Sequence, residues 1–323
     1  MYAEEIAMPK TGYAPENARS ATQPTGLAST EAGAAGYAGL DTWADAQILS
    51  AILHGQQRAI AAVGATLPAI AAAAGLAADA ISGGGRLVYL ASGSPALVSL
   101  GDALEIPQTY GVPRNRIVLI FAGGDAIFHN LTGAEEDDGA AAERAVADAA
   151  LGPADCVLGI SASGSTPFTV AGLAAAKAAG AKTVAIASNA GCPLFASGDV
   201  QVLLETGAEV IAGSTRMGAG TAQKAALNMI STLMGVRLGH VHDGMMVNVT
   251  ADNDKLRARA ARMIGQIARV DDKAAREALS RTGGAVKTAI LVAAGAEGPD
   301  GARALLEETG DNLRRALDRL SGR

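Results

Sequence analysis

The sequence predicts an α/β fold: a three-layer, doubly wound sandwich with a five-stranded parallel sheet at its centre. Short apolar runs rich in Val, Ile and Leu alternate with Ala-rich segments of helical spacing, such as 140–149 and 167–179, and this alternation is typical of βαβ units. Each run ends in small or polar residues, as buried parallel strands do where they lead into ligand-binding loops. The five runs are "RLVYLASG" (86–93), "RIVLIFAG" (116–123), "CVLGISAS" (156–163), "KTVAIASN" (182–189) and "VQVLLETG" (200–207).

The composition supports a layered core and narrows the choice of ligand. Only 3% of the 323 residues are aromatic, so the core must consist of Ala, Val, Leu and Ile, which suits helices packed closely on a sheet. The net charge is −6 and Lys and Arg form no basic stripe, so we expect no nucleic-acid partner. Small anionic ligands remain compatible, because local dipoles bind them whatever the overall charge.

Cysteine usage and hydropathy indicate a cytoplasmic protein. Cys156 and Cys192 form no CxxC pair, and Cys156 opens an apolar run, so we expect a buried thiol in a reducing compartment. Residues 1–28 lack the basic and apolar regions of a signal peptide, and we expect a flexible tail there. The stretch 59–82 is apolar enough to suggest a membrane, but it is mostly Ala and contains Pro68, which favours a buried helix.

N-cap residues and prolines predict the helices that flank the first two strands. Residues 41–82 are expected to form two helices, with Asp41 as an N-cap and Pro68 at a kink or break. The helix after the first strand is expected to end at Pro107. Glu105 would then lie beside a break in the structure and not on a regular solvent-facing surface.

A long helix over 215–238 is expected after the sheet, capped by Ser214 or Thr215. Beyond residue 251 the chain is charged and punctuated by glycines, which predicts a group of short helices. We find no internal repeat in this sequence.

Two loops rich in hydroxyl groups are candidate anion sites. "ASGSPA" (91–96) follows the first strand and "ISASGSTPFT" (160–169) follows the third. Backbone N–H groups and the dipole at a helix start favour a phosphate in such a place. Simple N-capping is the alternative, but it requires one hydroxyl, and the second loop has four, on Ser161, Ser163, Ser165 and Thr166.

Acidic and basic groups are concentrated in two further segments. "LTGAEEDDGA" (131–140) contains four consecutive carboxylates; an exposed helix N-terminus is the simplest explanation, because the helix dipole favours negative charge there. "EVIAGSTRMGAGTAQKAALNMIST" (209–232) combines a turn rich in Gly, Ser and Thr with two cations, Arg216 and Lys224, near a helix start. A helix cap alone does not require that composition.

The sequence gives no sign of a metal or nucleotide cofactor. His240 and His242 have an HxH spacing, but without a third ligand nearby a partly buried histidine pair is expected. There is no GxGxxG fingerprint, Walker loop or GxSxG elbow. We therefore expect no cofactor and no metal site.

Several motifs in order resemble a known family. The loops, with "ISASGSTP" as a serine-rich phosphate loop, are similar to the sugar isomerase (SIS) fold. "DALEIPQTYG", "IFAGGDAIF", "GAEEDD", "EVIAGSTRMGAGTAQKAALNMIST" and "NDKLRARAARMI" resemble the N-acetylmuramic acid 6-phosphate etherases, lyases of cell-wall recycling that are related to the glucokinase regulatory protein. The likeness covers residues 29 to 321. It implies a sugar-phosphate-binding SIS domain with N-terminal helices over 29–250 and a helical subdomain over 251–323.

The resemblance implies a reaction and its residues. A base removes the proton at carbon 2 of the open-chain sugar, D-lactate leaves carbon 3 with help from an acid, and water adds to the unsaturated intermediate, without a cofactor. The two catalytic carboxylates are Glu105 and, by an ungapped count from "AGG", Glu136, with Glu135 as the alternative. Which of the two is the acid and which the base stays open. The implied binding residues are Ser92, Ser94, Ser161, Ser163, Ser165, Thr166, Ser214 and Lys224.

The chain also departs from the family pattern. Leu97, Ser165 and Gly218 stand where an arginine, an arginine and a lysine are usual, and Thr30-Glu31 is followed by Ala32-Gly33-Ala34 instead of the usual Arg and Asn. Because the chain has fewer cations at these positions than the family pattern, we expect it to bind the anionic substrate differently. Two alternatives therefore stay open: a non-catalytic sugar-phosphate sensor, and a sugar phosphate isomerase on the same fold. The resemblance also implies a homodimer with sites near the subunit interface, and helices 41–82 and 215–238 are candidates for that contact.

Overall fold

A parallel five-stranded sheet forms the centre of the molecule, as predicted. The computed structural model describes residues 30, 35–130, 133–249 and 254–322, so the predicted tail at 1–28 lies outside the described residues. The strands run in the order β2-β1-β3-β4-β5, and all neighbouring pairs are parallel. Their bounds are β1 (Leu87–Ala91), β2 (Ile117–Phe121), β3 (Cys156–Ile160), β4 (Lys182–Ala187) and β5 (Val200–Leu203).

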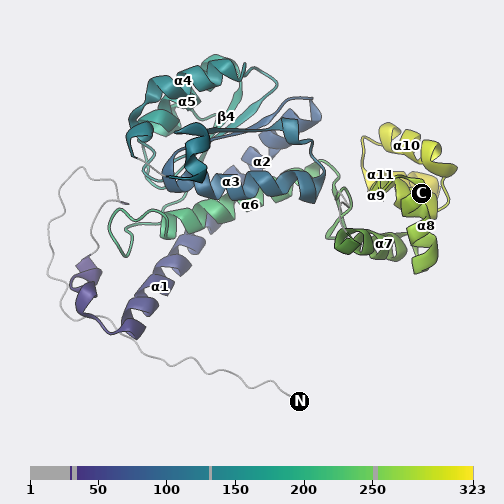
Figure 1. Cartoon of the computed structure of the whole chain (residues 1–323), viewed down its shortest axis with the longest axis horizontal. Coiled ribbons are helices and arrows are strands. Elements are labelled where there is room, and N and C mark those ends of the chain that lie inside the picture. Colours follow the sequence, from purple (N-terminus) through teal and green to yellow (C-terminus); the bar gives the residue numbers. More distant parts are fainter. Residues whose placement is uncertain (1–29, 31–34, 131–132, 250–253, 323) are drawn as a thin grey trace.

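Helices cover both faces of the sheet (Figure 1). Alternate residues of β1 enter different cores: Tyr89 packs in the cluster with α2, α3 and α6, whereas Leu90 packs in the cluster with α4 and α5. This alternation is the period-2 geometry of a strand that is buried on both sides. The covering helices are α2 (Leu67–Ser82), α3 (Gly93–Tyr110) and α6 (Gly218–Arg237) on one face, and α4 (Gly139–Asp148), α5 (Pro167–Ala178) and the short η6 (Pro193–Ser197) on the other.

Helix α1 (Asp45–Gly64) extends away from the sheet along α6 (Figure 1). The prediction that Asp41 caps it was wrong, because Asp41 lies in the 3-10 turn η2 (Leu40–Thr42) and Ala44 occupies the cap position. The predicted break is confirmed, with Pro68 in the first turn of α2, where its missing N–H costs nothing. The only fully buried side chains of α1 are Ala59 and Val63, so most of this helix is uncovered in the single chain.

The apolar stretch 59–82 therefore comprises the end of α1 and the whole of α2. Helix α2 packs on α6 and the sheet and buries six of its residues, including Ile70 and Ala73. No single helix among the described residues is long and apolar enough to cross a membrane, although α1 and α2, bent by 68° at their break, pass that test as a pair.

Two other predicted helix ends were wrong. Helix α3 continues through Pro107 to Tyr110 and ends at Gly111, whose φ of 65° closes the last turn; packing on β1 and α6 outweighs the local cost of the proline. Helix α6 begins at Gly218, and neither Ser214 nor Thr215 caps it. The side chain of Glu209 does so instead, accepting hydrogen bonds from the N–H groups of Gly218 (2.9 Å) and Ala219 (2.8 Å).

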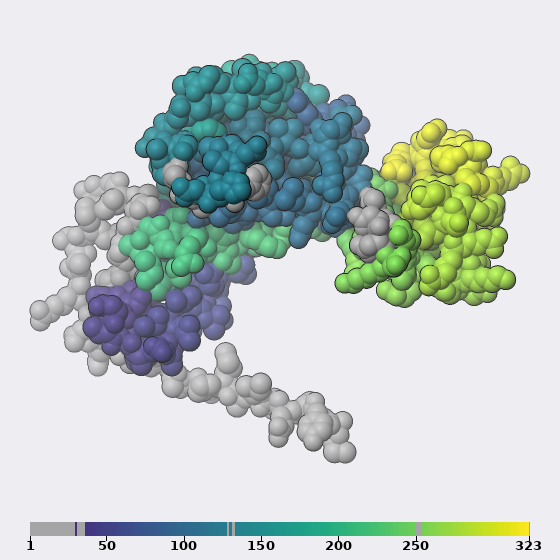
Figure 2. All heavy atoms as spheres, in the orientation of Figure 1, coloured from purple at the N-terminus to yellow at the C-terminus, as the bar shows by residue number. Residues whose placement is uncertain are grey.

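The C-terminal region forms a lobe of its own with a separate apolar cluster (Figure 2). A short hairpin, β6 (Val241–His242) and β7 (Met245–Met246), leads into it from α6. The boundary at residues 250 and 251 stays a prediction, since residues 250–253 are outside the described part of the chain. The helices of the lobe are α7 (Asp254–Ala268), α8 (Asp272–Arg281), α9 (Val286–Ala293), α10 (Gly298–Glu308) and α11 (Leu313–Leu320).

This lobe contains an internal repeat that sequence analysis missed. Thr282 ends α8 and Thr309 ends α10, and each hydroxyl donates back to two carbonyls of the preceding turn. Gly283 and Gly310 follow with φ of 62° and 66°, and a second helix starts after each. Both hairpins also share the sequence pattern A-R-x-x-L-x-x-T-G, at 275–283 and 302–310, and the equivalent bonds and burial show that this pattern marks a structural repeat. The equivalent buried pairs are Ala275 and Ala302, Leu279 and Leu306, and Ala289 and Ala316.

Charged side chains connect this lobe to the turn after α6. His240 lies 3.6 Å from the carboxylate of Asp311, which also accepts a 2.6 Å hydrogen bond from the buried Lys287. Burial raises the pKa of Asp311, but hydrogen bonds from His240 and Lys287 outweigh it and lower the pKa overall. The two histidines of the HxH pair thus face carboxylates, because His242 lies 3.5 Å from Asp243.

Candidate active site

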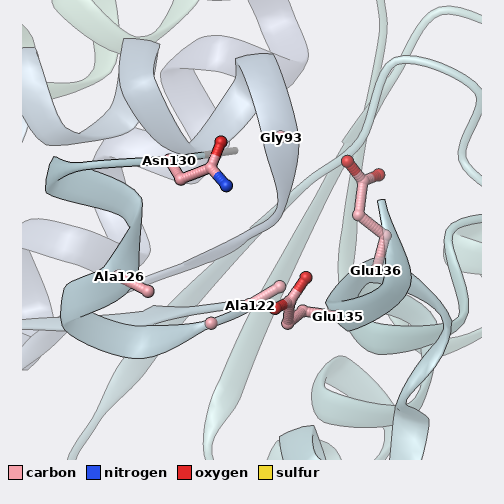
Figure 3. A pocket seen from close by; sticks show the side chains of 7 residues that line it. Gly93, Ala122, Ala126, Asn130, Glu135 and Glu136 are labelled. Carbon is pink, nitrogen blue, oxygen red and sulfur yellow. The ribbon is translucent and has the colours of Figure 1, made fainter. Parts of the chain in front are cut away.

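A small pocket opens at the carboxyl ends of β1 and β2 (Figure 3). The short helix η4 (Gly124–Phe128) follows β2, and η5 (Ala134–Asp137) carries the acidic cluster back toward the start of α3. In a doubly wound sheet this edge is where ligands bind, because the loops there are free of the packing constraints on the strands. The pocket is lined by Gly93, Ala122, Gly123, Ala126, Asn130, Glu135 and Glu136.

Glu136 is held against the first residues of α3. The Ser92 hydroxyl donates to its carboxylate at 3.4 Å, and a Cβ at Gly93 would lie 2.6 Å from its Oε1, so only glycine leaves room for it. Burial and the neighbouring Asp137 raise the pKa of Glu136, and the Ser92 hydrogen bond opposes them, with a net raised pKa. A carboxyl group with a raised pKa is suited to proton transfer near neutral pH.

The other members of the acidic cluster have different surroundings. Glu135 lines the same pocket (Figure 3), with its Cγ packed near Gly123. Asp138 caps α4, accepting a 2.8 Å hydrogen bond from the N–H of Ala141. The simple explanation, an acidic helix N-terminus, therefore holds for Asp138, whereas Glu135 and Glu136 face the pocket.

Glu105 lies away from this pocket. It is exposed on α3, twelve residues after Gly93, which corresponds to about 18 Å along the helix axis. Because α3 continues through Pro107, Glu105 stands on a regular helix face and not beside a break. Leu97 and Leu104, which lie seven residues or about two turns apart, share one side of α3 and are 44% and 52% exposed.

The second hydroxyl loop is ordered by its own side chains. Ser161 is buried; its hydroxyl accepts the N–H of Gly164 at 2.9 Å and bonds the Thr166 hydroxyl at 2.9 Å. Ser163 accepts from both the N–H and the hydroxyl of Ser165. Gly164 has a φ of 73°, and a Cβ there would lie 2.2 Å from the sulfur of Cys192. The loop thus has one fixed shape at the start of α5.

Asn189, which sequence analysis missed, ties this loop to the N-terminal segment. Its amide donates to the carbonyls of Ala162 and Ser163 and to the hydroxyl of Thr30. The Thr30 carbonyl in turn accepts from the N–H of Gly213, in the turn before α6. Thr30, the described residue of the fragment "STEA", is therefore anchored at the same edge of the sheet.

The remaining predicted binding residues are spread along this edge. Ser94 is half-buried in the first turn of α3, and Ser214 belongs to the turn before α6. Lys224 is exposed on α6, and its ammonium donates to Asn228. The structure thus brings Ser92 together with Glu135 and Glu136. It also brings the hydroxyls of 161–166 together with one another. Glu105 and Lys224 lie apart from both groups.

A buried polar network fixes α3 against α6 behind the pocket. The carboxylate of Asp102 accepts hydrogen bonds from Tyr89 (2.6 Å), Asn228 (2.6 Å) and Ser231 (2.9 Å). Burial, followed by the charge of Asp102, raises the pKa of Tyr89 well above its usual value. Asp102 and Glu209 are structural carboxylates that the motifs contained, and only the tertiary contacts distinguish them from catalytic ones.

Comparison with known proteins identifies the family. A family model for the SIS domain matches residues 54–188, from α1 to the end of β4. The N-acetylmuramic acid 6-phosphate etherase of Deinococcus radiodurans is 41% identical over 281 residues, which is 87% of this chain and 92% of the relative. The chain belongs to the N-acetylmuramic acid 6-phosphate etherase family. An etherase of Symbiobacterium thermophilum is 45% identical over 74% of this chain and 80% of the relative.

The departures from the etherase pattern lie on the edge just described. Leu97, in place of the usual arginine, is exposed on α3 close to the pocket, and Ser165, also in place of an arginine, is exposed on the hydroxyl loop. Gly218 is buried, and a Cβ there would lie 2.9 Å from the carboxylate of Glu209. At these three positions the chain therefore has an exposed leucine, an exposed hydroxyl and a buried glycine, where the family resemblance leads us to expect cations.

Proposed function

We propose that this chain is a carbon–oxygen lyase that cleaves the D-lactyl ether of N-acetylmuramic acid 6-phosphate. A base takes the proton from carbon 2, the bond from carbon 3 to the ether oxygen breaks, and an acid protonates the departing lactate. Water then adds across the carbon 2–carbon 3 double bond, its hydroxyl going to carbon 3 and its proton to carbon 2. The products are N-acetylglucosamine 6-phosphate and D-lactate, and the atoms of substrate and water are all accounted for.

The position and the raised pKa of Glu136 are the observation that supports this proposal. It is a half-buried carboxyl group with a raised pKa, aimed into a pocket at the ligand-binding edge of the sheet, in a chain 41% identical to an etherase over nearly its whole length. A raised pKa makes the ionised group a stronger base and the protonated group available as an acid near neutral pH. Its position supports Glu136 over Glu135, because Ser92 and Gly93 contact its carboxylate at the start of α3.

The loop at 161–166 is the proposed phosphate site. Its hydroxyls and the first N–H groups of α5 lie at a helix N-terminus, where the dipole and unpaired donors favour an anion. The loop has its shape before any ligand arrives, so little entropy is lost on binding. Hydroxyl and backbone donors replace the missing arginine here, and we expect weaker phosphate binding than a bidentate arginine provides.

We further propose a homodimer whose two subunits complete each site. Glu105 stands about 18 Å along α3 from the residues that hold Glu136, which is too far for both groups to act on adjacent carbons of one sugar. If two α3 helices pack antiparallel across a two-fold axis level with residue 99, midway between Gly93 and Glu105, Glu105 lies opposite the start of the partner's α3, beside its Glu136. Gly101 allows close approach, since a Cβ there would meet nothing within 4 Å.

Uncovered apolar side chains support this pairing. Besides Leu97 and Leu104 on α3, they occur on α1 and α6, the predicted contact helices, where exposures reach 66% at Leu49. Exposed apolar side chains grouped on adjoining helices are typical of protein–protein contacts. The others on these helices are Leu53, Ile60, Met229 and Val236.

The cytoplasm is the proposed location. Cys156 and Cys192 are free and buried, and burial raises the pKa of the Cys156 thiol to about 12. Such thiols act as small apolar groups and suit a reducing compartment.

Lactate release tests the proposed function. Purified protein is incubated with N-acetylmuramic acid 6-phosphate, and D-lactate is measured with a dehydrogenase-coupled assay. We expect turnover by wild type, a loss of at least about 100-fold in Glu136→Gln, and no change in Glu277→Gln, which removes an exposed carboxylate on α8. Carbon 2 proton exchange in heavy water without lactate would indicate an isomerase, and binding without either reaction would indicate a sensor; both refute the etherase proposal.

A further inference from the structure

Ser92 occupies the N-cap position of α3 but does not cap the helix. Its backbone is extended, with φ −135° and ψ 162°, and its side chain makes no hydrogen bond to the N–H groups of the first turn. A serine in this position ordinarily makes that bond, which stabilises the start of a helix. The hydroxyl of Ser92, in a residue only 3% exposed, is instead turned to the carboxylate of Glu136.

Gly93 lies against the second oxygen of the same carboxylate. Its φ of 56° and the 2.6 Å separation between a Cβ there and Glu136 Oε1 mean that the carboxylate rests on bare backbone. One oxygen of Glu136 is thus located by the glycine and the other by the serine hydroxyl. The neighbouring charges on this side are Glu135, in the same pocket, and Asp137, in the same turn, and no cation of the described residues forms an ion pair with Glu136.

We propose that Ser92 is a positioning residue for the lyase reaction: its hydroxyl orients the Glu136 carboxylate over the start of α3. This inference rests on the proposed function, in which Glu136 exchanges a proton with the substrate. Burial and Asp137 hold the proton on Glu136 more tightly, and Ser92 is the group that counteracts them. Ser92 therefore serves as the local substitute for a cation beside a catalytic carboxylate.

The sign of the effect follows from the direction of the hydrogen bond. Ser92 donates, so it stabilises the carboxylate and not the carboxylic acid. Removing it in Ser92→Ala raises the proton affinity of Glu136, and the limb of the kcat/KM profile that reports Glu136 moves to higher pH. Loss of one positioning hydrogen bond also lowers kcat by about fivefold to tenfold, with KM little changed because the hydroxyl holds the catalyst rather than the substrate.

Three variants and two readouts test the inference. Ser92→Ala removes the hydroxyl, and Ser92→Thr keeps it on a backbone that is already extended. Ser92→Cys keeps the side-chain volume but has only a weak hydrogen-bond donor. The matched control is Ser82→Ala, at the exposed end of α2. The pH profile of lactate release is measured for each, together with the titration of Glu136 by NMR of carboxyl-labelled protein. The NMR titration requires no turnover, so it separates failure of this inference from failure of the proposed function.

We expect the Glu136 titration and the kinetic limb to move to higher pH in Ser92→Ala and Ser92→Cys and to return in Ser92→Thr. A uniform loss of activity with an unmoved titration, or a loss in Ser92→Thr equal to that in Ser92→Ala, would show a merely structural role and overturn the inference. If Ser92→Ala does not fold, Ser92→Cys, which leaves no cavity, gives the same decision. Absence of lactate release by wild type would reject the proposed function and leave the titration as the test.

Discussion

Mixed dimers test whether each active site uses two subunits. Glu105→Gln and Glu136→Gln are each expected to lose at least about 100-fold in kcat, because each removes one proton-transfer group. The carboxylates must both come within about 3 Å of atoms on neighbouring carbons, hence within roughly 9 Å of each other. Within one chain Glu105 lies about 18 Å along α3 from Gly93, the residue that contacts the Glu136 carboxylate.

The magnitude of complementation follows from symmetry. In a dimer of one Glu105→Gln subunit and one Glu136→Gln subunit, one composite site has lost both carboxylates and the other has kept both. Random exchange makes about half of the dimers mixed, and one of their two sites is intact, so about a quarter of wild-type activity should return. Sites contained within single chains would recover nothing, because neither chain has both groups.

The assay uses the two inactive variants, tagged differently, co-expressed and purified through both tags. This selects mixed dimers, for which about half of wild-type activity per dimer is expected. A mixture of each inactive variant with Glu277→Gln, which is neutral, controls for the exchange itself. Lactate release by the doubly purified dimer that stays at the level of the parents refutes the composite site. Wild-type activity in Glu105→Gln alone would remove Glu105 from the machinery and favour Glu135 as the second carboxylate of the pocket.

Three further outcomes are expected. Leu104→Asp places a charge on the exposed face of α3; the subunit should stay folded by circular dichroism but lose both its dimer in light scattering and its lactate release. Gly93→Ala adds a Cβ 2.6 Å from a catalytic carboxylate oxygen at a φ of 56°, so kcat should fall at least tenfold with about 1 kcal/mol of lost stability, whereas Gly64→Ala, with open space around it, should change neither. Asp155→Asn weakens a buried ion pair with Arg86 at 2.7 Å and should cost about 2 kcal/mol in chemical unfolding. Burial raises the pKa of Asp155, but the Arg86 and Gly152 hydrogen bonds outweigh it and lower the pKa, so this stabilisation is present above pH ~4 and is lost as the pH falls further; an equal deficit at all pH values would contradict it.

Strand positions were predictable, whereas the helix ends that depend on distant partners were not. Each strand lies inside its predicted run, because a strand buried on both faces needs a continuous apolar stretch, which is a local property of the sequence. Helix ends depend on partners: α3 passes through Pro107 because β1 and α6 hold it, and α6 starts where the distant Glu209 supplies the cap. The repeat in the C-terminal lobe was missed although the letters A-R-x-x-L-x-x-T-G occur in both hairpins, and the equivalent Thr-to-carbonyl bonds are what reveal it.

The parallel sheet, the order of the loops along its carboxyl edge and the candidate carboxylates follow from the sequence, because periodicity, apolar runs and motif spacing are local. The role of each carboxylate depends on tertiary contacts. Asp102 and Glu209 are occupied by buried hydrogen bonds and Asp138 caps a helix, while Glu136 faces a pocket with Ser92 and Gly93 around it. Glu105, the acid of the "DALEIPQTYG" motif, stands on an exposed helix face. The role of a carboxylate depends on its hydrogen-bond partners and burial, which arise from residues far apart in the chain. In the site we propose, Glu105 acts together with groups of a second chain.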